Sequence, residues 1–234
     1  MTSRMKIAVG GAIALIVLGS APLWGPLVLR RMTFFRVRRV EILGARYLAP
    51  SDIIARLNVD TLASVWDPTA PLASRVEAYP GVAHANVRRR LPGTLVVQIV
   101  ERVPVALVSA PGGFRPYDDR GTALPIDPSR VAVDAPVLME RDVPLLKLLG
   151  AIRAGMPAMY ARVSAMRRPG HGEITLDLKS PAAASQTETV RAMDDLSLQR
   201  LADIEPVEQD LARKQLRATE IDLRFRDQVI ARLP

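Results

Sequence analysis

An alternating stretch of sequence between Pro80 and Pro104 constrains the fold more than any other feature of this chain. Apolar side chains occupy every second position on both sides of a central Pro92-Gly93 pair, so each half has one apolar and one polar face. Proline fixes φ near −65° and glycine accepts a positive φ, the combination that a type II turn requires. The stretch therefore predicts two antiparallel strands joined by a tight turn. The expected buried positions are Ala83, Ala85, Val87, Leu95, Val97 and Ile99, and the expected exposed ones are His84, Asn86, Arg88, Arg90, Thr94 and Gln98.

The positive charge of the chain is concentrated at its N-terminus. The 234 residues have a formal net charge of +8, and the first forty contain seven basic residues and no acidic one. Residues 41–234 hold 25 basic and 24 acidic residues, so this larger part is almost neutral. A nucleic-acid-binding domain concentrates positive charge on the folded surface that meets the phosphates. We therefore expect no nucleic-acid partner. The early basic residues are Arg4, Lys6, Arg30, Arg31, Arg36, Arg38 and Arg39.

An uncharged, largely apolar run covers residues 7–29. As a helix, these 23 residues would reach about 34 Å, enough to cross a bilayer with some tilt. We interpret the run as a membrane span that follows a short cytoplasmic tail, residues 1–6. The alternative is a cleaved signal peptide with Gly19-Ser20-Ala21 as its cleavage site, although Pro22 would hinder cleavage there and the apolar character continues to Leu29.

The orientation of this span is not given by its flanking charges. Two basic residues precede it and five arginines follow it, so the positive-inside rule alone would keep the C-terminal part in the cytoplasm. That rule is weaker when a large folded domain follows the span. We interpret the arginines as a solvated stripe beside anionic lipid headgroups and assign them no catalytic role.

After the span, the sequence predicts one strand, two helices and then the hairpin. Residues 35–42 contain apolar positions whose parity shifts midway, as in a strand with an irregular entry or a bulge. Pro50-Ser51-Asp52 opens a short helix. A second helix is expected over residues 68–78, with Asp67 as its N-cap. Together with the hairpin, the predicted order is β-α-α-β-β.

This segment resembles the polypeptide-transport-associated (POTRA) domain, and in detail that of the FtsQ/DivIB family of bacterial cell-division proteins. A POTRA fold alone would also fit outer-membrane assembly and secretion proteins. The resemblance to the FtsQ/DivIB family therefore rests on the sequences of the motifs. The motifs are Phe35-x-Val37-x-x-Val40-x-Ile42-x-Gly44, Pro80-x-Val82-x-x-Ala85-x-Val87-x-Arg89, Leu91-Pro92-x-Thr94-Leu95 and Glu101-Arg102-x-Pro104-Val105-Ala106.

The resemblance implies an α+β protein with a single N-terminal transmembrane helix at residues 7–29. A POTRA domain over residues 30–104 would precede a mostly β domain with helices, residues 105–234. In the second domain we expect strands on both sides of a turn at Asp118 to Gly121, a capped helix over 142–154, a strand over 172–178 and a helical stretch over 196–216 broken by Pro206. Residues 181–195 are hard to place as strands, and the cytoplasmic tail is shorter than the family's.

The family also implies a partner site. Its last domain contains a terminal strand of the form I/V-D-L-R-aromatic that lies near the sheet edge and recruits the division protein FtsB, itself associated with FtsL. In this chain Ile221 to Arg226 alternates strictly, and similarity places Leu223, Arg224 and Phe225 on the partner-binding positions, followed by Val229 and Ile230. An edge strand can bind another chain by strand addition. The competing interpretation is that Ile221, Leu223 and Phe225 fill a core, and for Leu223 we prefer that role.

The resemblance implies a non-enzymatic scaffold of the division machinery in the bacterial inner membrane, with its folded domains outside the cytoplasm at the septum. The two histidines, His84 and His171, lack metal-ligand spacing, there is no cysteine, and no phosphate loop or nucleophile motif is present. We expect neither a cofactor nor a small-molecule substrate. We expect other division proteins as further partners. The alternative is a membrane-anchored POTRA module that binds exported or outer-membrane polypeptides as a chaperone or secretion accessory.

Overall fold

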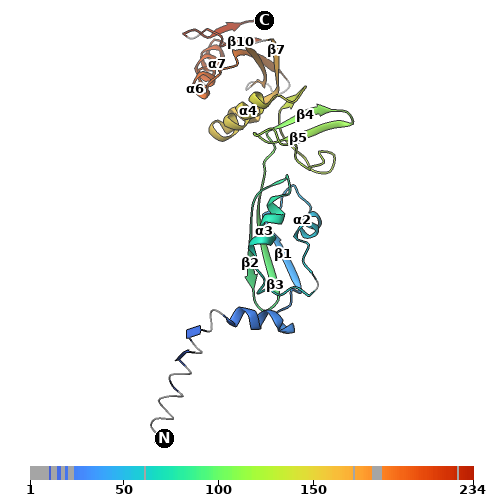
Figure 1. Cartoon of the computed structure of the whole chain (residues 1–234). Coiled ribbons are helices and arrows are strands. Elements are labelled where there is room, and N and C mark those ends of the chain that lie inside the picture. Colours follow the sequence, from blue (N-terminus) through green and yellow to red (C-terminus); the bar gives the residue numbers. More distant parts are fainter. Residues whose placement is uncertain are drawn as a thin grey trace, which may run out of the picture. The chain divides into compact units, whose positions relative to one another are not determined.

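The protein is described from a computed structural model (Figure 1). The structure describes residues 11, 15–16, 19–20, 24–60, 62–170, 172–180, 186–225 and 227–234. The chain divides into two compact units, Met1–Glu101 and Arg102–Pro234. Each unit has a hydrophobic core of its own. The mixed α+β composition that the sequence predicts is confirmed in both units.

The predicted cytoplasmic tail and membrane span lie mostly on residues that the structure does not describe. The tail at residues 1–6 and most of the predicted span at residues 7–29 are not among the described residues. Residues 24–31 form a helix. Within the described part of the chain, no helix combines the length and the apolar content that a bilayer crossing demands. The membrane span therefore stays a prediction.

The first unit contains a three-stranded sheet with two helices, in the predicted β-α-α-β-β order. The hairpin strands β2 and β3 are antiparallel, and β1 lies parallel to β3 on its other side, which leaves β1 and β2 as the two edges. A 3-10 turn at Thr33–Phe35 leads into β1. The elements are β1 (Arg39–Leu43), α2 (Pro50–Leu57), α3 (Ala70–Glu77), β2 (Val82–Arg90) and β3 (Thr94–Glu101).

Both helices cover one face of this sheet, because side chains from α2, α3, β2 and β3 share a single buried cluster. The alternation in the hairpin accounts for this burial, except at Ala83, which is exposed. The register of β2 shifts between Val82 and His84, and such a bulge turns the intervening side chain away from the core. The buried residues are Leu48, Ile53, Leu57, Val65, Val76, Tyr79, Val82, Ala85, Val87, Leu95, Val97 and Ile99.

Two local predictions in this unit are wrong. Asp67 does not cap α3, because its carboxylate accepts the backbone N–H of Ser64, and Thr69 is the N-cap residue. Gly93 does not have the positive φ of a type II turn. Glycine is instead needed there for close approach, since a Cβ atom would lie 2.6 Å from the carbonyl oxygen of Arg36.

The second unit is built on an eight-stranded sheet with the order β11-β10-β9-β8-β7-β6-β4-β5. Its free edges are therefore β11 and β5 (Figure 1). Four helices complete the described part of the unit. The strands are β4 (Ala106–Ala110), β5 (Gly113–Tyr117), β6 (Val137–Leu138), β7 (Val163–Gly170), β8 (Glu173–Lys179), β9 (Thr187–Met193), β10 (Glu220–Asp222) and β11 (Ile230–Arg232). The helices are α4 (Val143–Gly155), α5 (Pro157–Arg162), α6 (Leu198–Ala202) and α7 (Ile204–Arg213).

The core of the second unit joins the sheet to α4, α5 and α6. Asp142 caps α4 as predicted, because its side chain accepts the N–H of Leu145 at 3.1 Å. The apolar face of α4 is fully buried, and the inward positions of β8 are equally buried. These residues are Leu145, Leu146, Leu149 and Ile152 on α4, and Ile174, Leu176 and Leu178 on β8.

The second unit departs from the sequence predictions in four places. The helical stretch 196–216 breaks at Asp203 instead of Pro206, because Pro206 lies in the first turn of α7, where no backbone donor is required. The predicted strand 221–226 ends at Asp222. The segment 181–195 contains β9, a central strand of the sheet. After the turn at Asp118 to Gly121, only an isolated bridge between Tyr117 and Ala123 replaces the expected second strand.

Candidate functional site

The predicted partner-binding residues lie at one end of the eight-stranded sheet. Strand β10 pairs with β9 in parallel and with β11 in antiparallel orientation, so strands flank it on both sides. The free edge is β11, in which Ile230 pairs with Asp222 of β10. Any strand added at this end of the sheet must therefore pair with β11. The edge thus lies one strand further along the chain than the sequence predicted.

Leu223 belongs to the core of the unit. Its side chain is only 4% exposed, and its backbone N–H donates to the carbonyl oxygen of Arg191 on β9 at 2.8 Å. The buried contacts place Leu223 in the same cluster as Ile221. This residue anchors the end of β10 and offers almost no surface to a partner.

Arg224 binds carboxylates of its own chain. Its guanidinium donates to both carboxylate oxygens of Asp222, from Nε at 3.0 Å and 3.1 Å and from Nη2 at 2.6 Å, and also to Glu173 on β8. The hydrogen bonds from Arg224 lower the pKa values of both Asp222 and Glu173, and the two carboxylates raise the pKa of Arg224. Arg224 therefore holds the chain that leaves β10 against the sheet.

Further ion pairs extend this arrangement across four strands. Arg191 on β9 pairs with Glu173 at 3.0 Å and with Glu220 on β10 at 3.8 Å. Glu220 in turn lies 3.4 Å from Arg232 on the edge strand β11. Each of these pairs is partly exposed, so it contributes little to stability alone. Together the pairs link side chains of β8, β9, β10 and β11 on one face of the sheet end.

Phe225 presents its ring to solvent, with 49% of the residue exposed. Its backbone is held from the neighbouring helix α6, because Nη2 of Arg200 donates to the carbonyl oxygens of Phe225 and Gln228 at 2.5 Å each. The Nε of the same guanidinium lies 3.4 Å from the carbonyl oxygen of Leu223. Arg200 thus holds the backbone between β10 and β11 at Leu223, Phe225 and Gln228, while the aromatic side chain of Phe225 stays exposed. The sequence did not single out Arg200, since nothing in its local pattern marks a contact with residues 23 to 28 positions away.

The other two predicted residues divide between core and surface. Val229 is half-buried and packs against the core cluster. Ile230 begins the edge strand and is 46% exposed. Phe225 and Ile230 are therefore the predicted residues that combine apolar character with exposure next to the free edge.

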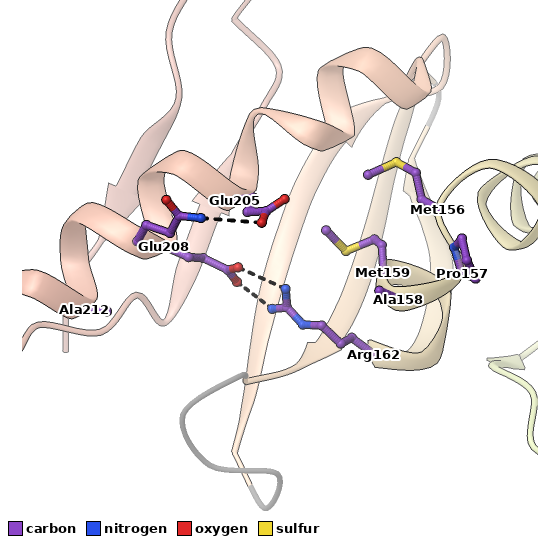
Figure 2. A pocket seen from close by; sticks show the side chains of 9 residues that line it. Met156, Pro157, Ala158, Met159, Arg162, Glu205, Glu208 and Ala212 are labelled. Carbon is purple, nitrogen blue, oxygen red and sulfur yellow. Dashed lines mark hydrogen bonds and ion pairs between the residues drawn. The ribbon is translucent and has the colours of Figure 1, made fainter.

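A groove lies between α5 and α7, with a cavity volume of about 540 Å³. Met156, Met159 and Arg162 line one wall, and Glu205 and Glu208 line the other (Figure 2). Only Ile204 is buried along α7, so this helix is more exposed than α4, which buries four side chains.

A buried charge network closes the floor of the groove. Arg162 donates from Nη1 and Nη2 to the two carboxylate oxygens of Glu208, at 2.9 Å and 2.5 Å, and from Nη2 to Glu188 on β9 at 2.8 Å. Burial, and then the hydrogen bond and charge of Glu208, raise the pKa of Glu188 to about 8 despite the opposing effect of Arg162. Burial would also raise the pKa of Glu208, but the hydrogen bonds from Arg162 and Glu188 outweigh it and lower that pKa. Near neutral pH the three groups therefore hold one positive charge, one negative charge and one shared proton.

The histidines supply no recognisable metal or catalytic centre within the described residues. His84 lies on the polar face of β2, where Nδ1 is 2.6 Å from a carboxylate oxygen of Glu77. His171 lies outside the described residues. In the part of the chain that is described, no group of three or more His, Asp or Glu side chains is arranged to hold a metal ion.

Comparison with known proteins identifies relatives of both units. A family model for the POTRA domain of FtsQ type matches residues 35–102, the strand–helix–helix–hairpin segment of the first unit. The cell division protein FtsQ of Rhodothermus marinus is 31% identical in an alignment of 245 positions that covers 97% of this chain and 86% of that protein. FtsQ of Streptomyces collinus is 30% identical over 85% of this chain and 72% of its own length. FtsQ of an Anaeromyxobacter species is 32% identical over 59% of this chain and 47% of its own length.

Proposed function

Because this chain belongs to the FtsQ family of cell-division proteins, we propose that it is a membrane-anchored scaffold that recruits FtsB-like and FtsL-like division proteins by strand addition at β11. In this proposal residues 1–6 are a cytoplasmic tail, residues 7–29 cross the inner membrane once, and residues 30–104 and 105–234 form the two extracytoplasmic domains. The protein acts at the septum without catalysis.

The observation that carries the proposal is the free edge of β11 with two exposed apolar side chains beside it. The edge strand leaves backbone donors and acceptors on its outer side for a partner strand. Phe225 and Ile230 supply the apolar contacts that such pairing needs for affinity and specificity. Arg224 acts indirectly, because its guanidinium is already bound to Asp222 and Glu173.

Phe225→Lys tests the proposal in the full chain. We expect this variant to lose capture of the FtsB-like protein of the same organism, because a charged side chain replaces an aromatic anchor at the interface. The far-ultraviolet circular dichroism spectrum should be unchanged, since Phe225 is exposed in the free protein.

Phe114→Lys is the matched control. Phe114 is 50% exposed and lies on β5, the opposite free edge of the same sheet. This variant should capture the partner as the unaltered chain does. Undiminished capture by Phe225→Lys, or equal loss in both variants, would remove the β11 edge from the proposed site.

A second candidate function is favoured by strand β2, a nine-residue edge of the first sheet. Such an edge could bind exported polypeptides in an extended conformation, as the chaperone alternative requires. Fluorescent tagging distinguishes the two functions. A division scaffold gathers at the septum of dividing cells, whereas a general polypeptide-binding module stays spread over the envelope at every stage of the cell cycle.

A further inference from the structure

Three segments far apart in the sequence meet at one end of the first unit. The backbone N–H of Val37 donates to the carbonyl oxygen of Ala63, and the N–H of Val65 donates to that of Phe35, both at 2.9 Å. The N–H of Arg38 donates to the carbonyl oxygen of Gly93, in the hairpin turn, at 2.8 Å. These bonds join residues 30–41, residues 59–60 and 62–68, and residues 88–94 into one surface, which we call the tip surface.

The tip surface has an excess of positive charge that the chain does not neutralise. It contains eight arginines and three acidic residues. Of these acids, Glu41 pairs with Arg90 at 2.6 Å, and Asp67 lies 3.7 Å from Arg30. Within the described part of the chain, no carboxylate pairs with the remaining exposed arginines. These are Arg31, Arg36, Arg38, Arg39 and Arg88.

Exposed apolar side chains lie among these arginines. Met32 and Phe34 come from the first segment, Leu62 from the second and Leu91 from the hairpin turn. Each is between 46% and 65% exposed, whereas the apolar side chains between the sheet and its two helices are buried. Four such residues, drawn from three joined segments, add exposed apolar surface to a cationic region.

The helix that precedes the tip surface continues this character. Residues 24–31 are helical, with Trp24, Leu27 and Val28 exposed. Arg30, at the end of this helix, donates from Nε to the carbonyl oxygen of Trp66 at 3.0 Å and so ties the helix to the tip surface. The helix thus places the tip surface next to the C-terminal end of the predicted membrane span.

We propose that the tip surface docks on the anionic headgroup region of the bilayer, with Met32, Phe34, Leu62 and Leu91 inserted between the headgroups and the surrounding arginines bound to lipid phosphates. The proposal rests on the membrane anchor of the proposed function. Interfacial segments of membrane proteins combine apolar side chains with arginine or lysine in this way, because the headgroup boundary offers both environments. The docked tip would hold the first unit upright on the membrane instead of leaving it on a free tether.

A site-specific label can test this contact because the chain has no cysteine of its own. The full chain with Leu91→Cys is labelled with an environment-sensitive fluorophore and inserted into nanodiscs that contain lipids with a quenching group in the headgroup region. One set of nanodiscs is purely zwitterionic phosphatidylcholine, and the other contains phosphatidylglycerol. We expect strong quenching in the anionic nanodiscs and weak quenching in the zwitterionic ones.

Ala83→Cys is the matched control in the same unit. Ala83 is also exposed, but it lies at the other end of β2, about 23 Å from Arg90 at 3.3 Å per strand residue. A label at this position should remain unquenched in both nanodiscs. The contrast separates docking of the tip surface from general proximity of the unit to the membrane.

The charges are tested by changing Arg31, Arg36, Arg38 and Arg39 to glutamine together in the Leu91→Cys chain. The anionic-lipid contribution to quenching should fall on the order of tenfold, because each arginine near an anionic surface contributes favourable binding free energy. Raising the salt concentration to about 1 M, where the Debye length is about 3 Å, should act in the same direction.

Three results would overturn the proposal. If the label at residue 91 is not quenched in anionic nanodiscs, the tip surface does not contact lipid, and a protein partner becomes the alternative occupant. Quenching that is equal in both lipids and insensitive to the four substitutions excludes recognition of anionic headgroups. Failure of the unaltered chain to enter nanodiscs contradicts the membrane anchor itself, and that outcome is seen separately, before any quenching is measured.

Discussion

The guanidinium of Arg200 holds the carbonyl oxygen of Phe225 at 2.5 Å and leaves the phenyl ring of Phe225 in solvent. One side chain on α6 therefore fixes the backbone of a loop whose apolar side chain is the proposed contact for a partner. Holding the loop in place before binding reduces the entropy that the partner interaction must offset. Arg200 is thus a positioning residue for the β11 edge. It can be substituted without changing any side chain of the proposed interface.

Arg200→Ala should weaken partner binding and lower the free energy of unfolding by about 1–2 kcal/mol, since it leaves backbone carbonyl oxygens without their donor. Arg200→Lys should restore little of the binding, because a single ammonium cannot reproduce a fork that reaches both Phe225 and Gln228. Isothermal titration with the FtsB-like partner and urea unfolding measure the two effects. Arg213→Ala, at the exposed end of α7, is the control and should change neither.

The two neighbours Leu223 and Phe225 should respond in opposite ways to truncation. Leu223→Ala should lower the free energy of unfolding by about 2–5 kcal/mol, because it opens a cavity in the core of the second unit. Phe225→Ala should leave that free energy within about 0.5 kcal/mol and should reduce partner affinity. Chemical unfolding and titration of both variants are the measurements. A large loss of stability in Phe225→Ala would mean that its ring is packed in solution.

The regular part of this fold could be predicted from the sequence because it depends on local periodicity. Alternation in β2 and β3 and capping of α4 by Asp142 are properties of neighbouring residues, and the structure confirms them. The end of β10 could not be predicted in that way. Residues 221–226 alternate strictly, but the hydrogen bonds from Arg224 to Asp222 and from Arg200 to the loop turn the chain away after Asp222. Such contacts depend on tertiary structure, which overrides the local pattern.

The motif Glu101-Arg102 also shows that a sequence pattern can mark residues without predicting their tertiary contacts. The sequence marks both residues as specific to the family, but their contacts come from the structure. The carboxylate of Glu101 accepts the backbone N–H groups of Arg46, Tyr47 and Leu48 at 2.8 to 2.9 Å, within the first unit. Arg102 pairs with Asp118 in the second unit at 3.2 Å.

Glu101→Gln should destabilise the first unit by about 1–3 kcal/mol. The NH₂ group of glutamine is a donor, so it cannot accept hydrogen bonds from the backbone N–H groups of residues 46–48. Hydrogen exchange should accelerate at the amides of Arg46, Tyr47 and Leu48. Glu41→Gln removes one partly exposed ion pair with Arg90 and should cost less than about 1 kcal/mol. Equal costs for the two variants would contradict the capping role of Glu101.

The network of Arg162, Glu188 and Glu208 predicts a pH dependence of stability. The pKa of Glu188 is raised from its ordinary value of 4.5 to about 8, so the folded protein holds a proton that the unfolded chain releases. This contribution is fully present below pH 4.5 and is lost as the pH rises through about 8. The pKa of Glu208 is lowered, so its contribution is present above 4.5 and is lost as the pH falls through that lowered value. The network therefore stabilises the fold best near pH 4.5 and weakens toward alkaline pH.

Glu188→Gln should remove the alkaline part of this dependence, because the amide keeps a hydrogen-bond donor without a titrating proton. Between pH 5 and pH 9 the unaltered chain should lose on the order of 4 kcal/mol more than the variant, measured by urea unfolding at each pH. Glu208→Gln leaves Glu188 alone with Arg162, which removes the neighbouring carboxylate that raises the pKa of Glu188. This second variant should shift the alkaline loss to lower pH. Parallel pH profiles for the unaltered chain and Glu188→Gln would show that Glu188 is ionised in the folded protein at neutral pH.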